Sequence, residues 1–225
     1  MSEKAASDRP ISLPITLVKR FGSLSALVAG AGSVGTRKVK RLVQAGASVR
    51  WVDPDPKAGE FIHPRVTRLI DRVQPEHFRG IAIVVACTND PLVNASIIGE
   101  GQANRCLTCD AIHPERGDFT FPSLVQRGRL QIAISTDGAS PSLSAELKQR
   151  LDGQYDDAYG TLTELLWELR ETVLKDVDDS ALRSAILRKL GGTAYLNHLR
   201  IYGEWATRTA LRIEMAKMVA ASVNR

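Results

Sequence analysis

The sequence predicts an α/β fold that is followed, in the last third of the chain, by α-helices alone. Between residues 24 and 134, short apolar runs alternate with amphipathic segments, which is typical of parallel strands joined by helical crossovers. The run over residues 81–86 is apolar throughout, as in a strand covered on both faces. Beyond residue 140, apolar residues recur every three or four positions, which indicates helices.

The apolar runs place the expected strands at residues 25–29, 48–52, 68–70, 81–86, 106–109 and 130–135. The expected helices cover residues 35–45, a single turn over 75–78, and residues 91–102, 142–151, 161–175, 180–190 and 196–221. The cluster Asp178-Asp179-Ser180 is typical of an N-cap for the segment over residues 180–190, and Gly191-Gly192 is a typical helix stop after it.

Composition narrows the classes of protein that the chain can belong to. It has 225 residues, a formal net charge of +5 and three cysteines, an odd number that argues against a disulfide framework. No apolar run approaches the ~20 residues of a membrane span. The basic residues are scattered, and no nucleic-acid motif accompanies them. We therefore expect a cytoplasmic protein that binds neither membranes nor nucleic acid, with a disordered lead over residues 1–12.

A glycine-rich turn follows the first expected strand. Gly30, Gly32 and Gly35 form a G-x-G-x-x-G pattern between that strand and a helix start, which is the context of a dinucleotide-binding loop. Gly30 allows a tight turn, Gly32 lets a diphosphate approach the backbone, and Gly35 allows close helix–strand packing. Ser33 and Val34 add backbone N–H groups at the helix start. The loop predicts a Rossmann-type site for NAD.

An acidic residue ends the next strand. Asp53 lies 21 residues after Gly32, where a carboxylate accepts hydrogen bonds from the adenosine ribose and repels a 2′-phosphate. The spacing therefore predicts a preference for NAD over NADP. A purely structural glycine turn with a capping aspartate is the alternative.

Polar residues follow the strand over residues 81–86, at the sheet edge where cofactor and substrate meet in open α/β folds. Thr88 and Asn89 are candidates for hydrogen bonds to the cofactor, although helix capping explains Thr88 equally well. Asp90 and Asn94 are typical of a helix start.

The strand over residues 106–109 carries two cysteines and leads into an aspartate. Cys106 and Cys109 have C-x-x-C spacing, but residues three apart in a strand point to opposite faces, so burial as small apolar side chains is favoured over a shared metal. Asp110 is a candidate general base or metal-attracting carboxylate, and an Asx turn is its alternative. His113 is a candidate metal ligand or proton partner, although a surface turn histidine explains it better.

Residues 135–141 join the last expected strand to a helix, with a sharp turn and then an N-cap before Pro141. We expect the hydroxyls and N–H groups of this turn to lie in the same cleft as Asp110, and a plain capped turn is the alternative. The candidate ligands for substrate carboxylates are Ser135, Thr136, Gly138 and Ser140.

Together these motifs resemble the precorrin-2 dehydrogenases, a family that includes the bifunctional dehydrogenase/ferrochelatases of sirohaem biosynthesis. The resemblance covers roughly residues 13–151, and its last segment, 129–141, is the most specific because generic Rossmann enzymes lack it. The matching pieces are Leu13-Pro14-Ile15, residues 28–38, residues 86–90 with Asn94, Asp110 before residues 119–123, and residues 129–141.

The resemblance implies a homodimer with an NAD-binding domain over residues 13–118, a dimerisation region over 119–151 and a helical domain over 152–225. It implies oxidation of precorrin-2 to sirohydrochlorin, with hydride passing to NAD⁺. It also implies that Asp110 takes part in the chemistry and, as in some members, in Fe²⁺ insertion. The turn from Asp110 to Phe119 is longer than in the family's pattern. This departure weakens the argument for metal insertion more than the argument for dehydrogenation.

The charge of the chain suits such a substrate, because a precorrin carries many carboxylates. Arg37 and Lys38 follow the glycine loop and are the nearest candidate cations for them. Two other functions remain open: another NAD-dependent dehydrogenase on the same scaffold, and an NAD(H)-sensing regulatory module. A sensor would not need the turn over residues 135–141 to face the cofactor.

Overall fold

The structure is a computed structural model that describes residues 24–223. The chain divides into two compact units, of which the first ends at Phe121 and the second begins at Pro122. The expected lead over residues 1–12 and the motif Leu13-Pro14-Ile15 lie outside the described residues.

The first unit contains a five-stranded sheet with the order β3-β2-β1-β4-β5, in which all neighbouring strands are parallel. Its strands are β1 (Ser25–Ala29), β2 (Ser48–Val52), β3 (Val66–Leu69), β4 (Ile83–Ala86) and β5 (Leu107–Asp110). The strand order reverses between β1 and β4, and ligands of open α/β sheets bind at such a point, outside the carboxyl ends of the strands. The predicted Rossmann-type fold is confirmed.

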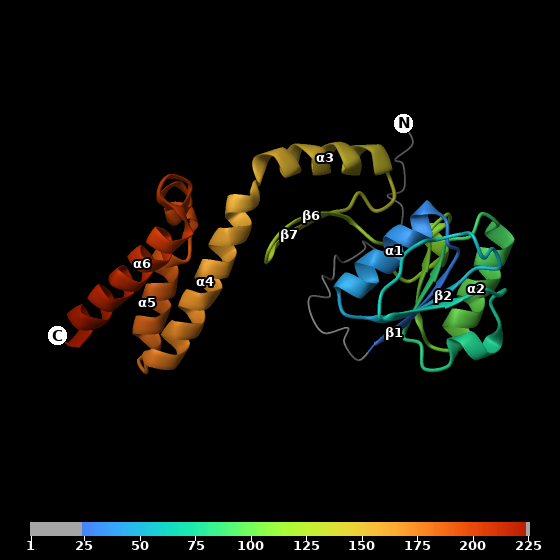
Figure 1. The fold of residues 1–225 in the computed structure, drawn as a ribbon, viewed down its shortest axis with the longest axis horizontal. Helices are drawn as coiled ribbons and strands as arrows, with labels where there is room; N and C mark the ends of the chain where they lie inside the picture. The colour runs from blue at the N-terminus through green and yellow to red at the C-terminus, as the bar shows by residue number, and fades with distance from the viewer. Residues whose placement is uncertain (1–23, 224–225) are drawn as a thin grey trace, which may run out of the picture. The chain divides into compact units, whose positions relative to one another are not determined.

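Helices cover both faces of this sheet, as Figure 1 shows for α1 (Ser33–Gln44) and α2 (Pro91–Ala103). Alternate strand residues point to opposite faces, so Val28 packs in the core on the α1 side and Leu27 in the core on the α2 side. Two short 3₁₀ turns, Pro75–Phe78 and Pro114–Arg116, complete the unit.

The second unit combines a β-hairpin with helices. Apolar residues of α4, α5 and α6 form its core. Its elements are β6 (Ser123–Arg127), β7 (Leu130–Ile134), α3 (Pro141–Gln154), α4 (Asp157–Asp176), α5 (Ser180–Leu190), a 3₁₀ turn over Thr193–Tyr195 and α6 (Leu196–Val223). The expected helical nature of the chain beyond residue 140 is confirmed.

One expectation about the strands is wrong. The strand near residues 130–135 does not extend the parallel sheet, because β7 pairs antiparallel with β6, a strand that the sequence pattern did not indicate. The reason is the two-residue connection at Gly128 and Arg129, where Gly128 has a φ of 53°. Such a short link joins antiparallel strands only, since a parallel pair needs a crossover of a dozen residues. Helix α3 also continues beyond residue 151, the expected end of the dimerisation region.

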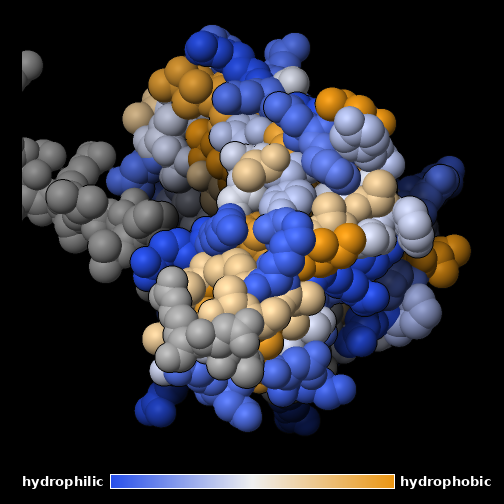
Figure 2. All heavy atoms as spheres, turned by 90° about the vertical axis from the view of Figure 1, so that its left-hand side faces the viewer, coloured by the Kyte–Doolittle hydropathy of each residue, from blue (hydrophilic) through white to orange (hydrophobic). Residues whose placement is uncertain are grey.

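Helix α6 contains a bend at Gly203, where φ is 81°. Next to this bend, Ile201, Tyr202 and Trp205 are exposed. Figure 2 views the α4–α6 end of the second unit and shows separate apolar groups among polar side chains. Within residues 24–223, no helix is long and apolar enough to cross a membrane.

Candidate functional site

The glycine loop between β1 and α1 has the geometry of a dinucleotide cradle. Gly30 has a φ of 100°, and a Cβ at this position would overlap the carbonyl oxygen of Cys87. A Cβ at Gly35 would overlap the carbonyl oxygen of Gly30, so the helix packs on the strand as closely as glycine permits. At Gly32, by contrast, a Cβ would meet nothing within 4 Å. Open space therefore borders the backbone at the position where a diphosphate would approach.

The N-terminus of α1 is prepared for an anion. Among the described residues, no side chain caps α1 or α4, whereas side chains of Asp90, Ser140 and Asp179 cap α2, α3 and α5. The first N–H groups of a helix lack partners within the helix and lie at the positive end of its dipole. Ser33 is exposed at this end and Val34 is half-buried. These features fit the diphosphate of NAD.

Asp53 follows β2 and contacts the glycine loop directly. Its Oδ2 accepts a hydrogen bond from the backbone N–H of Ala31 at 2.6 Å, and its Oδ1 accepts one from the N–H of Asp55 at 2.9 Å. Each carboxylate oxygen keeps a further lone pair that a ribose hydroxyl could use. The contact with Ala31 also gives Asp53 a structural part in holding the loop.

Thr88 lies at the end of β4, and its hydroxyl serves the start of α2. The hydroxyl donates to Oδ1 of Asn94 at 2.7 Å, and the amide of Asn94 donates back to the carbonyl of Thr88 at 3.2 Å. Oδ1 of Asp90 accepts from the N–H of Leu92 at 2.8 Å, as the sequence predicted for a helix start. The geometry favours the capping role of Thr88, while Asn89 is exposed at the same edge.

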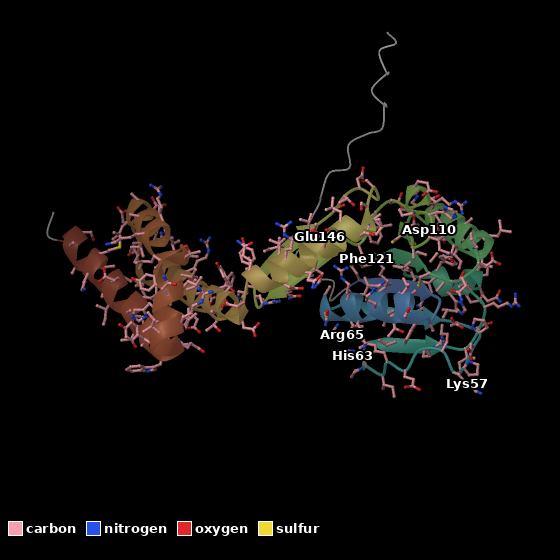
Figure 3. All side chains as sticks on the ribbon, turned by 90° about the horizontal axis from the view of Figure 1, so that it is seen from above. Lys57, His63, Arg65, Asp110, Phe121 and Glu146 are labelled. Atoms are coloured by element: carbon pink, nitrogen blue, oxygen red, sulfur yellow. The ribbon has the colours of Figure 1, made fainter. Side chains whose placement is uncertain are left out.

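Asp110 ends β5, beside Ala86 at the end of β4, and is 1% exposed (Figure 3). Its Oδ1 accepts from the N–H groups of Ile112 at 2.8 Å and His113 at 3.0 Å, which forms the Asx turn. Its Oδ2 is buried without a hydrogen-bond partner in the described part of the chain. Buried polar atoms almost always have partners, so this oxygen points to a functional role.

The neighbouring metal candidates do not form a cluster. Nδ1 of His113 lies 3.0 Å from Oε1 of Glu115, so the ring of His113 is paired with a carboxylate other than Asp110. Between residues 24 and 223, no group of three or more His, Cys, Asp or Glu could hold a metal ion. Asp110 and His113 therefore have no third protein ligand there.

The two cysteines of the C-x-x-C sequence lie on opposite faces of the sheet, as expected from their spacing. Cys106 belongs to the core on the α2 side and Cys109 to the core on the α1 side. Both are buried and free. Burial raises the pKa of the Cys109 thiol to about 11 and that of the Cys87 thiol to about 12. Thiols held in the protonated form are poor nucleophiles and poor metal ligands.

Cations gather along α1 after the glycine loop. Arg37 is exposed, whereas Lys38 is half-buried with its Nζ 4.0 Å from the ring centroid of Phe121, which Figure 3 marks. Burial lowers the pKa of Lys38, and the charge of Arg41 lowers it further. Arg41 also lies over the Phe121 ring, with its guanidinium carbon 5.4 Å from the centroid. This concentration of positive charge suits a substrate with carboxylates.

The turn over residues 135–141 belongs to the second unit and has the predicted local form. Gly138 has a φ of 79°, and Oγ of Ser140 accepts from the N–H of Leu143 at 3.1 Å. The hydroxyl of Thr136 lies 3.1 Å from the carbonyl oxygen of Ser140, and Oγ of Ser135 accepts a backbone hydrogen bond from within the turn. These contacts match the capped turn. The expected common cleft with Asp110, a residue of the first unit, stays a prediction.

Two residues that sequence reasoning missed organise the loops of the site. Oδ2 of Asp118 accepts from both the N–H and the hydroxyl of Thr108 at 2.8 Å, which closes the loop that begins at Asp110. Arg68 holds the loop after Asp53 by hydrogen bonds to backbone carbonyls. Apart from the contact of Arg68 with Leu69, their partners are 10 or more residues away along the chain, so no local pattern could reveal them.

Comparisons with known proteins agree with this geometry. The family described as "Putative NAD(P)-binding" matches residues 17–123, and the family described as "Sirohaem biosynthesis protein central" matches residues 127–154.

Among the curated relatives, the precorrin-2 dehydrogenase of Priestia megaterium is 35% identical over 154 residues, which cover 65% of this chain and 73% of that protein. Siroheme synthase 2 of Aeromonas salmonicida is 32% identical over 170 residues, which cover 73% of this chain and 35% of that protein. The chain thus matches only about a third of the length of such siroheme synthases.

A solved structure supports the fold. The protein named SirC, precorrin-2 dehydrogenase, aligns with a TM-score of 0.72 and 24% sequence identity, over 92% of this chain and 100% of that chain. At this level of identity, the likeness shows that the two proteins share a fold.

Proposed function

Because the chain belongs to the family of the precorrin-2 dehydrogenases, we propose that it oxidises precorrin-2 to sirohydrochlorin with NAD⁺ as the hydride acceptor. The observation that carries the proposal is the partnerless, buried Oδ2 of Asp110. This oxygen lies at the carboxyl edge of the same sheet whose β1 and β2 ends form the dinucleotide cradle. A proton acceptor beside a dinucleotide site is the combination that a dehydrogenation needs.

The described residues fit NAD. Gly30, Gly32 and Gly35 leave room for the diphosphate, with Ser33 and Val34 supplying N–H groups at the start of α1. Asp53 would hold the adenosine ribose, and Thr88 and Asn89 would border the cofactor from the end of β4. NAD⁺ supplies a hydride acceptor when bound.

Asp110 takes the proton that completes the oxidation. Conversion of precorrin-2 to sirohydrochlorin removes two electrons and two hydrogens from the macrocycle, one as hydride and one as a proton. Oδ1 is held by two backbone N–H groups, which fixes the carboxylate, and Oδ2 receives the proton. General-base groups of this kind contribute ~10²–10⁴-fold to a rate.

The macrocycle is bound through its carboxylates. Arg37 and Lys38 supply positive charge on α1, next to the glycine loop. The turn of the second unit contributes further contacts through its hydroxyls and N–H groups. Its candidate ligands are Ser135, Thr136, Gly138 and Ser140.

The working form is a homodimer in the cytoplasm, with residues 119–151 as the dimerisation region. The buried, free state of Cys87, Cys106 and Cys109 fits a reducing compartment.

Insertion of Fe²⁺ into sirohydrochlorin, a lyase activity, is a second candidate function. The same Oδ2 of Asp110 favours it, because metal insertion requires removal of pyrrole protons and a carboxylate that escorts the metal. His113 would assist from the adjacent turn. Fe²⁺ is a substrate of this reaction.

Incubation with precorrin-2 and NAD⁺, followed by visible spectroscopy, tests the proposal. We expect the spectrum of sirohydrochlorin to appear only when NAD⁺ is present, and a further change on adding Fe²⁺ if the chain also inserts metal. An NAD(H) sensor would bind the dinucleotide and leave the macrocycle spectrum unchanged. A different NAD-dependent dehydrogenase would do the same with this substrate, and either result contradicts the proposal.

A further inference from the structure

We propose that Arg68 is a positioning residue for cofactor selection, because its guanidinium fixes the loop over residues 53–59 and so aims Asp53 at the ribose. This inference rests on the proposed use of NAD. Arg68 lies on β3, paired in register with Trp51 of β2. Arg68 is not part of the glycine-rich motif, and no sequence motif identifies it as a residue of the cofactor site.

The guanidinium of Arg68 donates to carbonyl oxygens on both sides of Asp53. Nη1 contacts the carbonyl oxygens of Trp51 at 3.2 Å, Asp53 at 3.3 Å and Leu69 at 2.8 Å, and Nη2 contacts those of Asp55 at 3.0 Å and Ala58 at 3.1 Å. Only the planar, multi-donor fork of arginine can hold so many carbonyls at once. One side chain therefore holds this loop at several points along its path.

The loop in turn holds the Asp53 carboxylate. The N–H of Asp55 donates to Oδ1 of Asp53 at 2.9 Å, and the N–H of Lys57 donates to Oδ1 of Asp55 at 2.8 Å. Arg68 holds the carbonyl oxygens of Asp53 and Asp55, which belong to the peptide units on either side of the one that carries the Asp55 N–H, so it restrains the N–H group that orients Asp53. Loss of the guanidinium would release this chain of contacts.

Arg68 is also connected to the glycine loop through Trp51. The guanidinium carbon lies 5.2 Å from the centroid of the Trp51 ring, and Nε1 of that ring donates to the carbonyl oxygen of Gly30 at 3.0 Å. Trp51 is fully buried. The pair of Arg68 and Trp51 therefore connects the loop after Asp53, which would bind the ribose, with the glycine loop, which would bind the diphosphate.

The hydrogen bonds of the Arg68 guanidinium to carbonyl oxygens affect the selectivity between NAD and NADP. An arginine near the end of the second strand accommodates the 2′-phosphate in dinucleotide sites that accept NADP. Here both terminal nitrogens of Arg68 are occupied by carbonyl oxygens. Arg68 therefore supports the carboxylate that excludes the phosphate, although its own charge would attract one.

The test compares R68Q and R68K with the wild type and with R72Q, a control at an exposed arginine shortly after β3. NADH and NADPH are titrated by fluorescence without any tetrapyrrole, and hydrogen exchange is measured for residues 53–59. For R68Q we expect the Kd for NADH to rise about tenfold, equivalent to about 1.4 kcal/mol, and exchange in the loop to accelerate. The ratio of the NADPH and NADH Kd values should fall toward one.

R68K retains the charge without the fork, so it should show the same changes at smaller size and serves if R68Q does not fold. R72Q should bind both dinucleotides within twofold of the wild type. Wild-type NADH affinity and selectivity in both Arg68 variants would overturn the inference while leaving the proposed function intact. A wild-type protein that binds neither dinucleotide would instead overturn the proposed function and this inference with it.

Discussion

The two carboxylate oxygens of Asp110 have different surroundings, which assigns a structural role to one oxygen and leaves the other available for chemistry. Oδ1 accepts two backbone hydrogen bonds that form the turn after β5, whereas Oδ2 is buried with no partner among residues 24–223. A purely structural aspartate would be expected to pair both oxygens or to expose one to water. The asymmetry therefore favours a chemical role for Oδ2.

Replacing Asp110 by asparagine should remove the proton acceptor and keep the turn. We expect D110N to lower kcat with precorrin-2 by ~10²–10⁴-fold, the usual range for loss of one acid–base group, because an amide oxygen can still accept the turn hydrogen bonds. The Kd for NADH, measured by fluorescence titration, should stay within twofold.

D90N is the matched control, since Oδ1 of Asp90 also accepts two backbone hydrogen bonds, here at the start of α2. It should leave kcat within twofold of the wild type. Near-normal turnover in D110N would return Asp110 to a structural role. Loss of Fe²⁺ insertion alone, with oxidation intact, would mark Asp110 as a residue of the metal reaction.

Lys38 makes a pH-dependent contribution to stability. Burial lowers its pKa below the ordinary 10.5, so the folded protein binds this proton more weakly than the unfolded chain. The free energy of unfolding of the wild type, relative to K38M, should therefore increase as the pH rises toward 10.5. Urea titrations of both proteins at about pH 7 and about pH 10 measure this difference in the free energy of unfolding. A difference that stays constant or decreases with pH contradicts the burial of a charged Lys38.

At the scale of elements, the junction of β1 and α1 depends on a glycine that permits close packing. A Cβ at Gly35 would overlap the carbonyl oxygen of Gly30, whereas a Cβ at Gly99 of α2 would meet nothing within 4 Å. We expect G35A to lower the free energy of unfolding by ~1–3 kcal/mol through overpacking. G99A should raise it by up to ~1 kcal/mol through helix propensity. Chemical denaturation compares the two, and equal effects would contradict the packing argument.

The sequence predicted the elements of the first unit well, because its periodic signals agree with its tertiary contacts. The expected ranges 25–29 and 48–52 coincide with β1 and β2. The hairpin partner β6 was missed because the segment Ser123–Arg127 mixes polar and apolar residues on a half-exposed strand. Its pairing with β7 is set by the turn at Gly128, a signal that the sequence reading did not weigh.

In the candidate site, too, residues with a local sequence pattern were identified from the sequence, whereas residues that act through long-range contacts were not. The close packing at Gly30 and Gly35 and the position of Asp53 beside the glycine loop were predictable, because they follow from spacing along the chain. Arg68 and Asp118 were not, since each acts on backbone groups brought to it by the fold. The partnerless state of the Asp110 oxygen is likewise a property of packing alone.

At the scale of the whole molecule, the proposed dimer makes a simple prediction. If residues 119–151 mediate self-association, the protein should sediment at micromolar concentration with about twice the chain mass of 24.6 kDa. Analytical ultracentrifugation measures this mass directly. A mass close to that of one chain, independent of concentration, would contradict the dimer.

The central claim is that a hydride passes from precorrin-2 to NAD⁺ on this protein. The most direct measurement is the amount of NADH formed under anaerobic conditions, compared with the amount of precorrin-2 converted in the same sample. We predict equal amounts, with no NADH formed when either precorrin-2 or the protein is left out. Conversion of precorrin-2 without matching NADH, or binding of NAD⁺ without any conversion, would contradict the account.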